Sequence, residues 1–150
     1  MEFLTFILGG EEYGLPILQV QEIRGWEEPT PMPESPDFVK GVINLRGRVV
    51  PIVDLRDRFH LDASYNDTTV VIVVRIQHDT GEKVIGIVVD AVSEVYNIKD
   101  DEIQSAPNVR GAIGAEFVQG LSTVENKMLI LLNIDSLVTE GLIQQAASVA

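Results

Sequence analysis

KGVINLRGRVVPIVDLR, at residues 40–56, combines a turn that displays two arginines with an apolar run typical of a β-strand. Gly47 can take a positive φ without the steric penalty of a Cβ, so we expect the chain to reverse between Arg46 and Arg48. The β-branched run that follows predicts a strand, with Pro51 at an edge or a bulge. The stretch therefore predicts two cations held at the lip of a β-structure.

Apolar, β-branched runs recur along the rest of the chain, with turn residues between them. They predict strands over residues 3–8, 49–55, 68–76, 84–89 and 128–134. Residues 68–76 are nearly all apolar, which predicts a strand buried on both faces. Helical signals are few: a single turn after Pro16, an acidic turn at residues 100–102 and a short C-terminal helix at about 135–147. The pattern predicts an all-β barrel or sandwich.

Two parts of the chain echo each other loosely. Residues 6–17 and 73–88 each predict a strand, a polar turn with glycine and a second strand. The turn at residues 65–67 could divide two lobes, and the four prolines between Pro29 and Pro36 predict a stiff loop.

The length and composition limit the class of protein. A chain of 150 residues predicts one compact unit, or two small lobes that share a core. The absence of cysteine excludes disulfides and thiolate metal sites. The N-terminal residues do not fit a signal peptide, and the apolar runs are too short to span a bilayer as helices, so we expect no direct membrane insertion.

The charge is strongly negative but unevenly placed. The net charge of −12 disfavours binding to nucleic acid or anionic lipid. Residues 40–58 nevertheless carry +3, while the rest of the chain carries −15. Two interpretations stay open: these arginines and lysine form a surface for an acidic partner, or they pair with the protein's own carboxylates.

The titratable residues do not form a catalytic or metal-binding pattern. His60 and His78 lie in separate polar contexts without further ligands at metal-site spacing. Asp54 and Asp57 alternate with arginines, which favours structural ion pairs over acid–base catalysis. No glycine motif fits a phosphate loop. We therefore expect no enzymatic activity, no cofactor and no metal, and a binding module that contacts its partners through strand edges or a cleft between lobes.

The same stretch carries a family resemblance. Residues 41–47 and 50–56 resemble the signature of the CheW-like domain family, the coupling proteins of bacterial chemotaxis. Further segments with the same resemblance follow in order, at residues 3–9, 11–14, 20–25, 86–93 and 128–131. The resemblance implies a single CheW-like domain over residues 1–150, built as two small five-stranded SH3-like barrels packed together. We expect approximate lobes at residues 13–66 and 67–134, with the N-terminal strand 1–8 shared or added to the second lobe.

The resemblance also implies a function: a non-catalytic cytoplasmic adaptor, recruited to membrane-associated receptor clusters. Its partners would be the regulatory domain of the histidine kinase CheA and the cytoplasmic tip of a methyl-accepting chemoreceptor. The implied receptor-binding residues are Val20, Glu22, Arg46, Val71, Val92 and Val95. The implied kinase-binding positions are Ile17, Gln104 and Val109, although Gln104 and Val109 depart from the basic and aromatic residues of the family pattern. Gly41 and Gly47 are expected to shape the turn.

Three alternatives remain at this stage. Each valine of the implied receptor site could belong to the core, and Arg46 could simply hold the Gly47 loop. The chain could serve a non-chemotactic signalling pathway with the same fold. It could also be a small ligand-binding β-barrel, which a dry apolar pocket with a perturbed titratable group would support.

Overall fold

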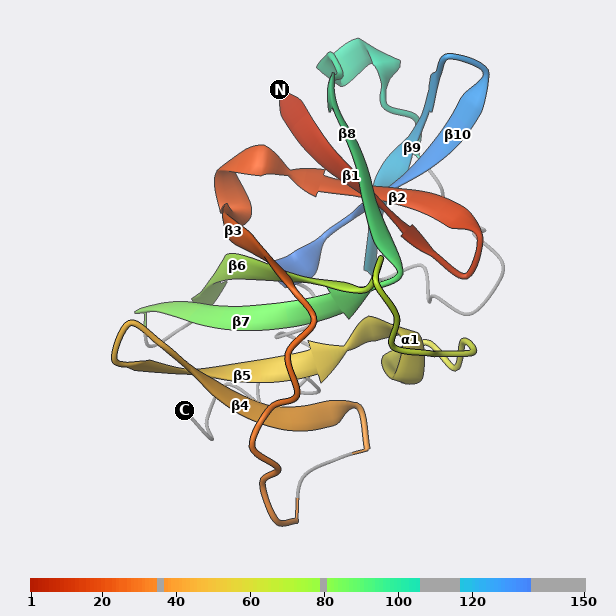
Figure 1. Cartoon of the computed structure of the whole chain (residues 1–150). Helices are drawn as coiled ribbons and strands as arrows, with labels where there is room; N and C mark the ends of the chain where they lie inside the picture. The colour runs from red at the N-terminus through yellow and green to blue at the C-terminus, as the bar shows by residue number, and fades with distance from the viewer. Residues whose placement is uncertain (35–36, 79–80, 106–116, 136–150) are drawn as a thin grey trace.

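The computed structural model describes residues 1–34, 37–78, 81–105 and 117–135, and within these ranges it is built almost entirely of strands (Figure 1). The strands are β1 Glu2–Leu8, β2 Glu11–Pro16, β3 Val20–Gly25, β4 Val39–Leu45, β5 Arg48–Asp54, β6 Val70–His78, β7 Gly81–Val89, β8 Ala91–Asn97, β9 Val118–Val124 and β10 Lys127–Leu132. One helical turn, α1 Leu55–Arg58, and two 3-10 turns, η1 Ile17–Gln19 and η2 Asp100–Glu102, complete the elements. The strand runs and the two short turns predicted from the sequence are confirmed, and the predicted C-terminal helix lies outside the described residues beyond Asp135.

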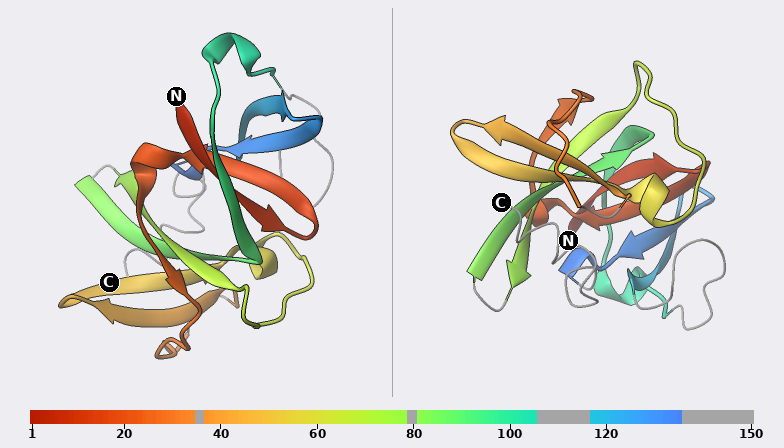
Figure 2. Two further views of the ribbon diagram at one scale, coloured as in Figure 1. Left: turned by 45° about the horizontal axis from the view of Figure 1, so that its top comes forward. Right: turned by 90° about the horizontal axis from the view of Figure 1, so that it is seen from below.

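The strands form two five-stranded sheets, which confirms the predicted all-β class with two five-stranded units. Sheet A has the order β8-β1-β2-β10-β9, and sheet B has the order β3-β6-β7-β5-β4. Each sheet contains one parallel pair, β10 with β2 in sheet A and β5 with β7 in sheet B. All other neighbours are antiparallel. The two sheets lie against each other, as the views in Figure 2 show.

The two sheets are copies of one topology, related by a circular permutation of the chain. Each residue pair of the hairpin β4–β5 has a counterpart in the hairpin β9–β10. The register shift also falls at the same place: between Val39 and Gly41 of β4, and between Leu131 and Leu132 of β10, where Leu131 pairs with Gly120. An isolated bridge joins the segment after each end strand to the opposite end of its sheet: Thr30 with Val42, and Gln104 with Leu121. The hairpins β1–β2 and β6–β7 also correspond, so the loose echo between residues 6–17 and 73–88 has a structural basis.

This permutation changes where the two halves divide. Sheet B uses residues 20–89 without interruption, while sheet A joins the N-terminal strands to the last three. The expected lobe boundary near residues 66 and 67 therefore does not separate the sheets, because β6 and β7 complete sheet B. The N-terminal strand β1 belongs with the second set of strands.

Three apolar clusters hold the fold together. The central core lies between the sheets and takes side chains from both, such as Phe6 and Leu15 of sheet A and Ile72 and Ile87 of sheet B. A second cluster fills the far face of sheet B, and a third, around Phe3, fills the far face of sheet A. Strands β6 and β7 contribute to two clusters at once, so their side chains are buried on both faces, as the apolar run predicted.

Two residues of the signature have roles other than those expected. Pro51 lies in β5, which is flanked by β4 and β7, and pairs with Val42 without a register shift. It precedes Ile52, where the recorded pairing with β7 begins, so Pro51 is not a bulge residue, and its β7 side is an unpaired position within an internal strand. Gly41 lies inside β4 rather than in the turn, at φ 138°, and a Cβ there would stand 2.1 Å from the Thr30 carbonyl oxygen.

Candidate functional site

The end strands β3 and β8 present the same short motif in the same geometry. In β3 the motif is Val20-Gln21-Glu22-Ile23, and in β8 it is Val92-Ser93-Glu94-Val95. One extra residue bulges from each end strand at the matching position, between Val20 and Glu22 and between Val92 and Val95. A bulge re-aims the side chains beside it, so the two strands present their motifs alike.

The motifs lie on one side of the molecule. Strands β3 and β8 are visible together in Figure 1 and run in opposite directions, and Figure 2 (left) shows the same arrangement. Ile23 is 45% exposed and Val95 is 47% exposed. We call Val20, Glu22, Ile23, Val92 and Val95 the β3–β8 face. It combines exposed aliphatic groups with a carboxylate on rigid strands, which suits a protein interface.

Val20 and Val92 belong partly to the core and partly to the surface. Each is half-buried and packs against the central core. Each therefore anchors its strand to the core and leaves part of its surface open. Val71 differs: it is 3% exposed and packs inside the cluster of sheet B, so it lies beside β3 in the neighbouring strand β6, paired with Arg24, rather than lining the surface.

Arg46 is placed by the hairpin turn between β4 and β5. Arg46 and Gly47 both have positive φ, 52° and 85°, as two-residue hairpin turns of type I′ require. The Asn44 Oδ1 accepts a hydrogen bond from the Gly47 amide and stabilises the turn. The Arg46 Nη2 then lies 3.1 Å from Glu22 Oε1 on β3, while the Arg46 side chain stays 66% exposed. The arginine is thus oriented by the β3–β8 face and still open to a partner.

The basic segment at residues 40–58 is mostly used within the protein. Lys40 forms an ion pair with Asp57, and Arg56 pairs with Asp54 and Asp90. The Arg58 guanidinium lies 5.2 Å from the centre of the Phe117 ring. Of the basic residues in this segment, Arg46 and Arg48 at the hairpin tip are the exposed ones. Pairing with the protein's own carboxylates therefore accounts for Lys40, Arg56 and, in part, Arg46, whereas a surface for an acidic partner stays a prediction for the exposed hairpin tip.

The remaining predicted contact residues are spread over the molecule. Ile17 begins η1 and packs against the central core. Gln104 is exposed and its backbone pairs with Leu121 of β9, at the edge of sheet A. Val109 lies outside the described residues.

A buried polar network joins the two sheets, and sequence reasoning found only part of it. The Arg56 side chain, 1% exposed, donates from Nε and Nη2 to the two oxygens of Asp54 and from Nη1 to Asp90 Oδ1, at 2.9 to 3.0 Å. Asp90 in turn accepts a hydrogen bond from the Gly9 amide in the β1–β2 turn of sheet A. The alternation of Asp and Arg predicted structural ion pairs, and the Asp54–Arg56 pair confirms this. The pair forms because Asp54 caps α1 by accepting from the Arg56 amide, and the helical turn folds Arg56 back onto it.

Tyr65 completes this network from the surface side. Its hydroxyl donates to Asp54 Oδ2 at 2.8 Å, and its ring stacks on Trp26 with centroids 4.1 Å apart. Burial and the hydrogen bond to Asp54 raise the pKa of Tyr65 above its ordinary value. Burial alone would lower the pKa of Arg56, but its hydrogen bonds to Asp54 and Asp90 outweigh that effect and raise it. Both groups therefore keep their protons.

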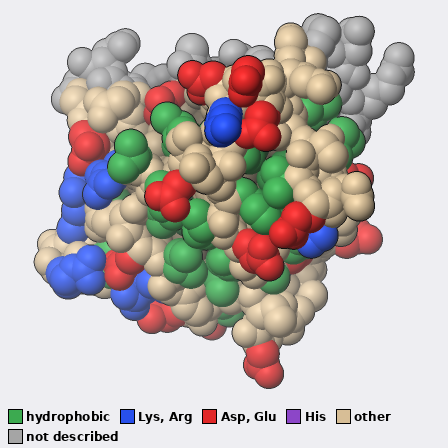
Figure 3. Space-filling view, turned by 90° about the horizontal axis from the view of Figure 1, so that it is seen from above, with side chains coloured by type: hydrophobic (Ala, Val, Ile, Leu, Met, Phe, Trp, Pro, Cys, Tyr) green, Lys and Arg blue, Asp and Glu red, His purple; other side chains and the backbone are tan. Residues whose placement is uncertain are grey.

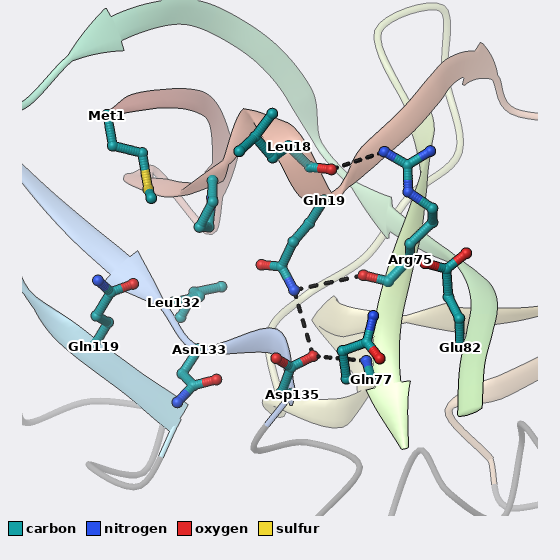
Figure 4. Close-up of a pocket in the computed structure, with 11 residues that line it drawn as sticks. Met1, Leu18, Gln19, Arg75, Gln77, Glu82, Gln119, Leu132, Asn133 and Asp135 are labelled. Atoms are coloured by element: carbon teal, nitrogen blue, oxygen red, sulfur yellow. Dashed lines mark hydrogen bonds between the residues drawn. The ribbon is translucent and has the colours of Figure 1, made fainter. Parts of the chain in front are cut away.

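A polar pocket of about 440 Å³ lies where η1, β6 and β10 meet (Figure 4). The Gln19 Nε2 donates to Asp135 Oδ1 at 3.4 Å, and the same oxygen accepts from the Gln77 amide at 3.2 Å. Arg75 Nη2 donates to the Leu18 carbonyl at 2.8 Å. These hydrogen bonds join η1, β6 and the segment after β10, so the pocket is a polar seam between the sheets rather than the dry apolar pocket that a ligand-binding barrel would need.

Within the described ranges, no group of three or more His, Asp or Glu side chains is arranged to hold a metal ion. The helical segments of the described chain include none with the length and apolar character needed to cross a bilayer.

Comparison with known proteins places the chain in a family. Residues 2–141 match the family model described as the CheW-like domain. The chain is 47% identical over 139 residues to the chemotaxis protein CheW of Klebsiella aerogenes, covering 92% of this chain and 81% of that protein. It is 38% identical over 135 residues to the chemotaxis protein CheW of Rhizobium meliloti, covering 90% of this chain and 85% of that one.

A solved structure agrees with these sequence matches. The crystal structure of the scaffolding protein TtCheW from Thermoanaerobacter tengcongensis superposes with a TM-score of 0.80 at 34% identity, and the match covers 88% of each chain. Sequence signature, two permuted five-stranded sheets and these similarities lead to one conclusion: the chain belongs to the CheW-like domain family.

Proposed function

We propose that this protein is a chemotaxis adaptor, which couples chemoreceptor cytoplasmic tips to the regulatory domain of the histidine kinase CheA. The observation that carries the proposal is the β3–β8 face, where matched strands from the two sheets display aliphatic side chains beside the oriented Arg46. Relatives named as chemotaxis and scaffolding proteins support the same role.

The β3–β8 face suits a helical partner. Ile23 and Val95 offer exposed apolar contacts, and Val20 and Val92 on the same two strands are half-buried against the central core. β-Branched side chains lose little rotamer freedom on binding because they are already stiff. Arg46 would supply hydrogen bonds to carboxylates or carbonyls of the receptor and so set its register. Val71 would contribute by supporting β3.

The kinase would contact other surfaces. We place one contact around Ile17, where the adjacent Leu18 is 73% exposed, and the other at the edge of sheet A near Gln104 and Val109. Two separate contacts would leave the β3–β8 face open, so that one adaptor can hold both partners.

The proposal includes no catalytic step. The polar groups of the described residues serve hydrogen bonds and ion pairs that stabilise the fold, and the family is one of scaffold proteins. In this proposal the protein acts in the cytoplasm, at membrane-associated receptor clusters. A role in a non-chemotactic pathway or as a ligand-binding barrel is not favoured by the named relatives.

Co-sedimentation tests the proposal. The chain would be mixed with a CheA-type kinase and a clustered receptor cytoplasmic fragment, and kinase activity would be measured in the pellet. We expect the kinase to sediment and become active only when the chain is present. Arg46→Glu should reduce receptor-dependent sedimentation at least tenfold, whereas Arg48→Glu, with the same charge change two residues away, should reduce it far less. A folded wild-type chain that binds neither partner would overturn the proposal.

A further inference from the structure

The permuted sheets allow a position-by-position comparison, and it reveals a difference in charge at one end of sheet A. We call Glu12, Glu94, Tyr96, Ser122 and Glu125 the sheet A mouth. By strand register, their counterparts in sheet B are, in the same order, Val84, Glu22, Arg24, Ile43 and Arg46. The three carboxylates thus lie where sheet B has one apolar side chain, one carboxylate and one arginine, and Tyr96 stands where sheet B has a second arginine.

The hairpin tips show the difference most directly. Glu125 and Asn126 form the β9–β10 turn with positive φ, as Arg46 and Gly47 do in β4–β5. In sheet B the turn residue is an arginine, 3.1 Å from the Glu22 carboxylate. In sheet A the turn residue is Glu125, and the bulge residue equivalent to Glu22 is Glu94. The basic member of the pair is therefore replaced by a second acid.

Tyr96 lies among these acids. Its hydroxyl donates to Glu125 Oε2 at 3.4 Å. A hydrogen bond to Glu94, burial, and the negative charges of Glu125, Glu94 and Glu12 raise the pKa of Tyr96 above its ordinary value. The three carboxylates are thus close enough to act on one hydroxyl.

Two buried polar atoms of the mouth have no hydrogen-bond partner. The Glu12 side chain is 9% exposed, its Oε1 lies 4.0 Å from Lys127 Nζ, and its Oε2 is unpartnered. Ser122, 3% exposed, has an unpartnered Oγ. Both residues pair with Leu129, one from each side, so their side chains share the face of sheet A that carries Tyr96. A buried acceptor without a donor is unfavourable, so the mouth retains unused capacity to accept hydrogen bonds.

We propose that the sheet A mouth binds a lysine or arginine side chain of a protein partner, which supplies the positive charge that Arg46 supplies within sheet B. A guanidinium has five donors in a planar fork, and it can meet carboxylates and a hydroxyl together. Figure 3, which views the molecule from above, shows acidic side chains scattered over the visible face while most of the visible Lys and Arg side chains gather at one edge. The inference stands apart from the proposed receptor and kinase contacts, because it rests on the comparison of the two sheets.

A side-chain probe tests the site on the intact chain. N-acetyl-arginine-amide would be titrated into the 15N-labelled protein, with N-acetyl-citrulline-amide as the uncharged control. We expect saturable shifts in the amide signals of Glu12, Ser122 and Glu125 with the arginine probe and none with citrulline. Glu125→Gln should weaken the binding about tenfold, as expected for loss of a charge-assisted contact. Glu28→Gln removes the same charge from an exposed position in the loop that follows β3 and should leave the binding unchanged.

A second variant separates a binding site from a general negative field. Glu125→Arg places in sheet A the residue that sheet B already has, so it should raise the thermal unfolding midpoint and abolish the arginine-induced shifts. The proposal would be overturned by any of three results: no saturable shifts in the wild-type protein, equal shifts with citrulline, or equal weakening by Glu28→Gln. A lowered midpoint in Glu125→Arg would overturn the argument from the paired sheets.

Discussion

Arg46 and Glu22 form an ion pair between the tip of the β4–β5 hairpin and β3, elements at opposite ends of the strand order of sheet B. The pair therefore links the two ends of sheet B, which are not joined by a strand ladder. The isolated bridge between Thr30 and Val42 links the same two ends. It holds a largely exposed arginine in one orientation beside the β3–β8 face.

Exchanging the two charges separates stability from binding. Arg46→Glu should lower the free energy of unfolding by about 1 kcal/mol or less, because exposed ion pairs contribute little. The double variant Arg46→Glu with Glu22→Arg should recover that loss in urea unfolding but not the receptor binding, since the cation would then sit on β3. An Arg46→Glu chain that does not fold would show that Arg46 is structural.

Gly47→Val tests the hairpin turn. Gly47 has φ 85°, a conformation in which a β-branched residue is strained, so we expect a loss of about 1–2 kcal/mol in the free energy of unfolding. Gly25→Val is the matched control, because the space around its Cβ position is open. Equal urea midpoints for the two variants would contradict the assigned turn.

The glycines at matching bulges should differ in their tolerance of a methyl group. Gly41→Ala would place a Cβ 2.1 Å from a backbone oxygen, and we expect it to destabilise by about 3 kcal/mol or more. At Gly120 the nearest atoms are 2.6 and 2.8 Å away, and one belongs to the Ile103 side chain, so Gly120→Ala should cost less. Gly10→Ala, at φ 82° with open space around it, measures the backbone penalty alone. In thermal unfolding, the midpoint should fall most for Gly41→Ala, less for Gly120→Ala and least for Gly10→Ala.

Alkaline pH should destabilise the protein partly through Tyr65. Its pKa is raised in the folded state by burial and by the hydrogen bond to Asp54. Below the unfolded pKa of about 10 the tyrosine is protonated in both states and its contribution is complete. As the pH rises further, the unfolded state loses the proton first, so the free energy of unfolding falls.

Tyr65→Phe checks this assignment, since it keeps the ring that stacks on Trp26 and removes the hydroxyl. We expect a loss of about 1 kcal/mol at neutral pH and a shallower decline of stability above pH 10. The measurement is urea unfolding at a series of pH values. An unchanged alkaline slope would assign the effect to the other tyrosines.

The strands were predictable from the sequence because local patterns encode them. β-Branched runs such as residues 70–76 and turn residues such as Gly47 determine local conformation with little help from the rest of the chain. The family signature also predicted two five-stranded units. The division of the strands between sheets was not predictable from periodicity, because the parallel pairs β10–β2 and β5–β7 join segments distant in the sequence.

The candidate site was predictable only in part for the same reason. The sequence places Arg46 and Glu22 in different motifs, and their contact depends on how sheet B curves. Val71 and Val95 look alike in the sequence, yet one is buried in β6 and the other is exposed on a bulged end strand. The acidic sheet A mouth was missed because Glu12 and Glu125 are ordinary turn-flanking acids until the sheets are compared.

The circular permutation has a consequence for the order in which the protein is made. Sheet B is encoded by one uninterrupted run of the chain, so all its strands can pair as soon as β7 has left the ribosome. Strands β1 and β2 are made before sheet B and can pair with each other, but their outer neighbours, β8 and β10, follow only after β7. The earliest hairpin to be synthesised is therefore among the last parts of the protein to be completed.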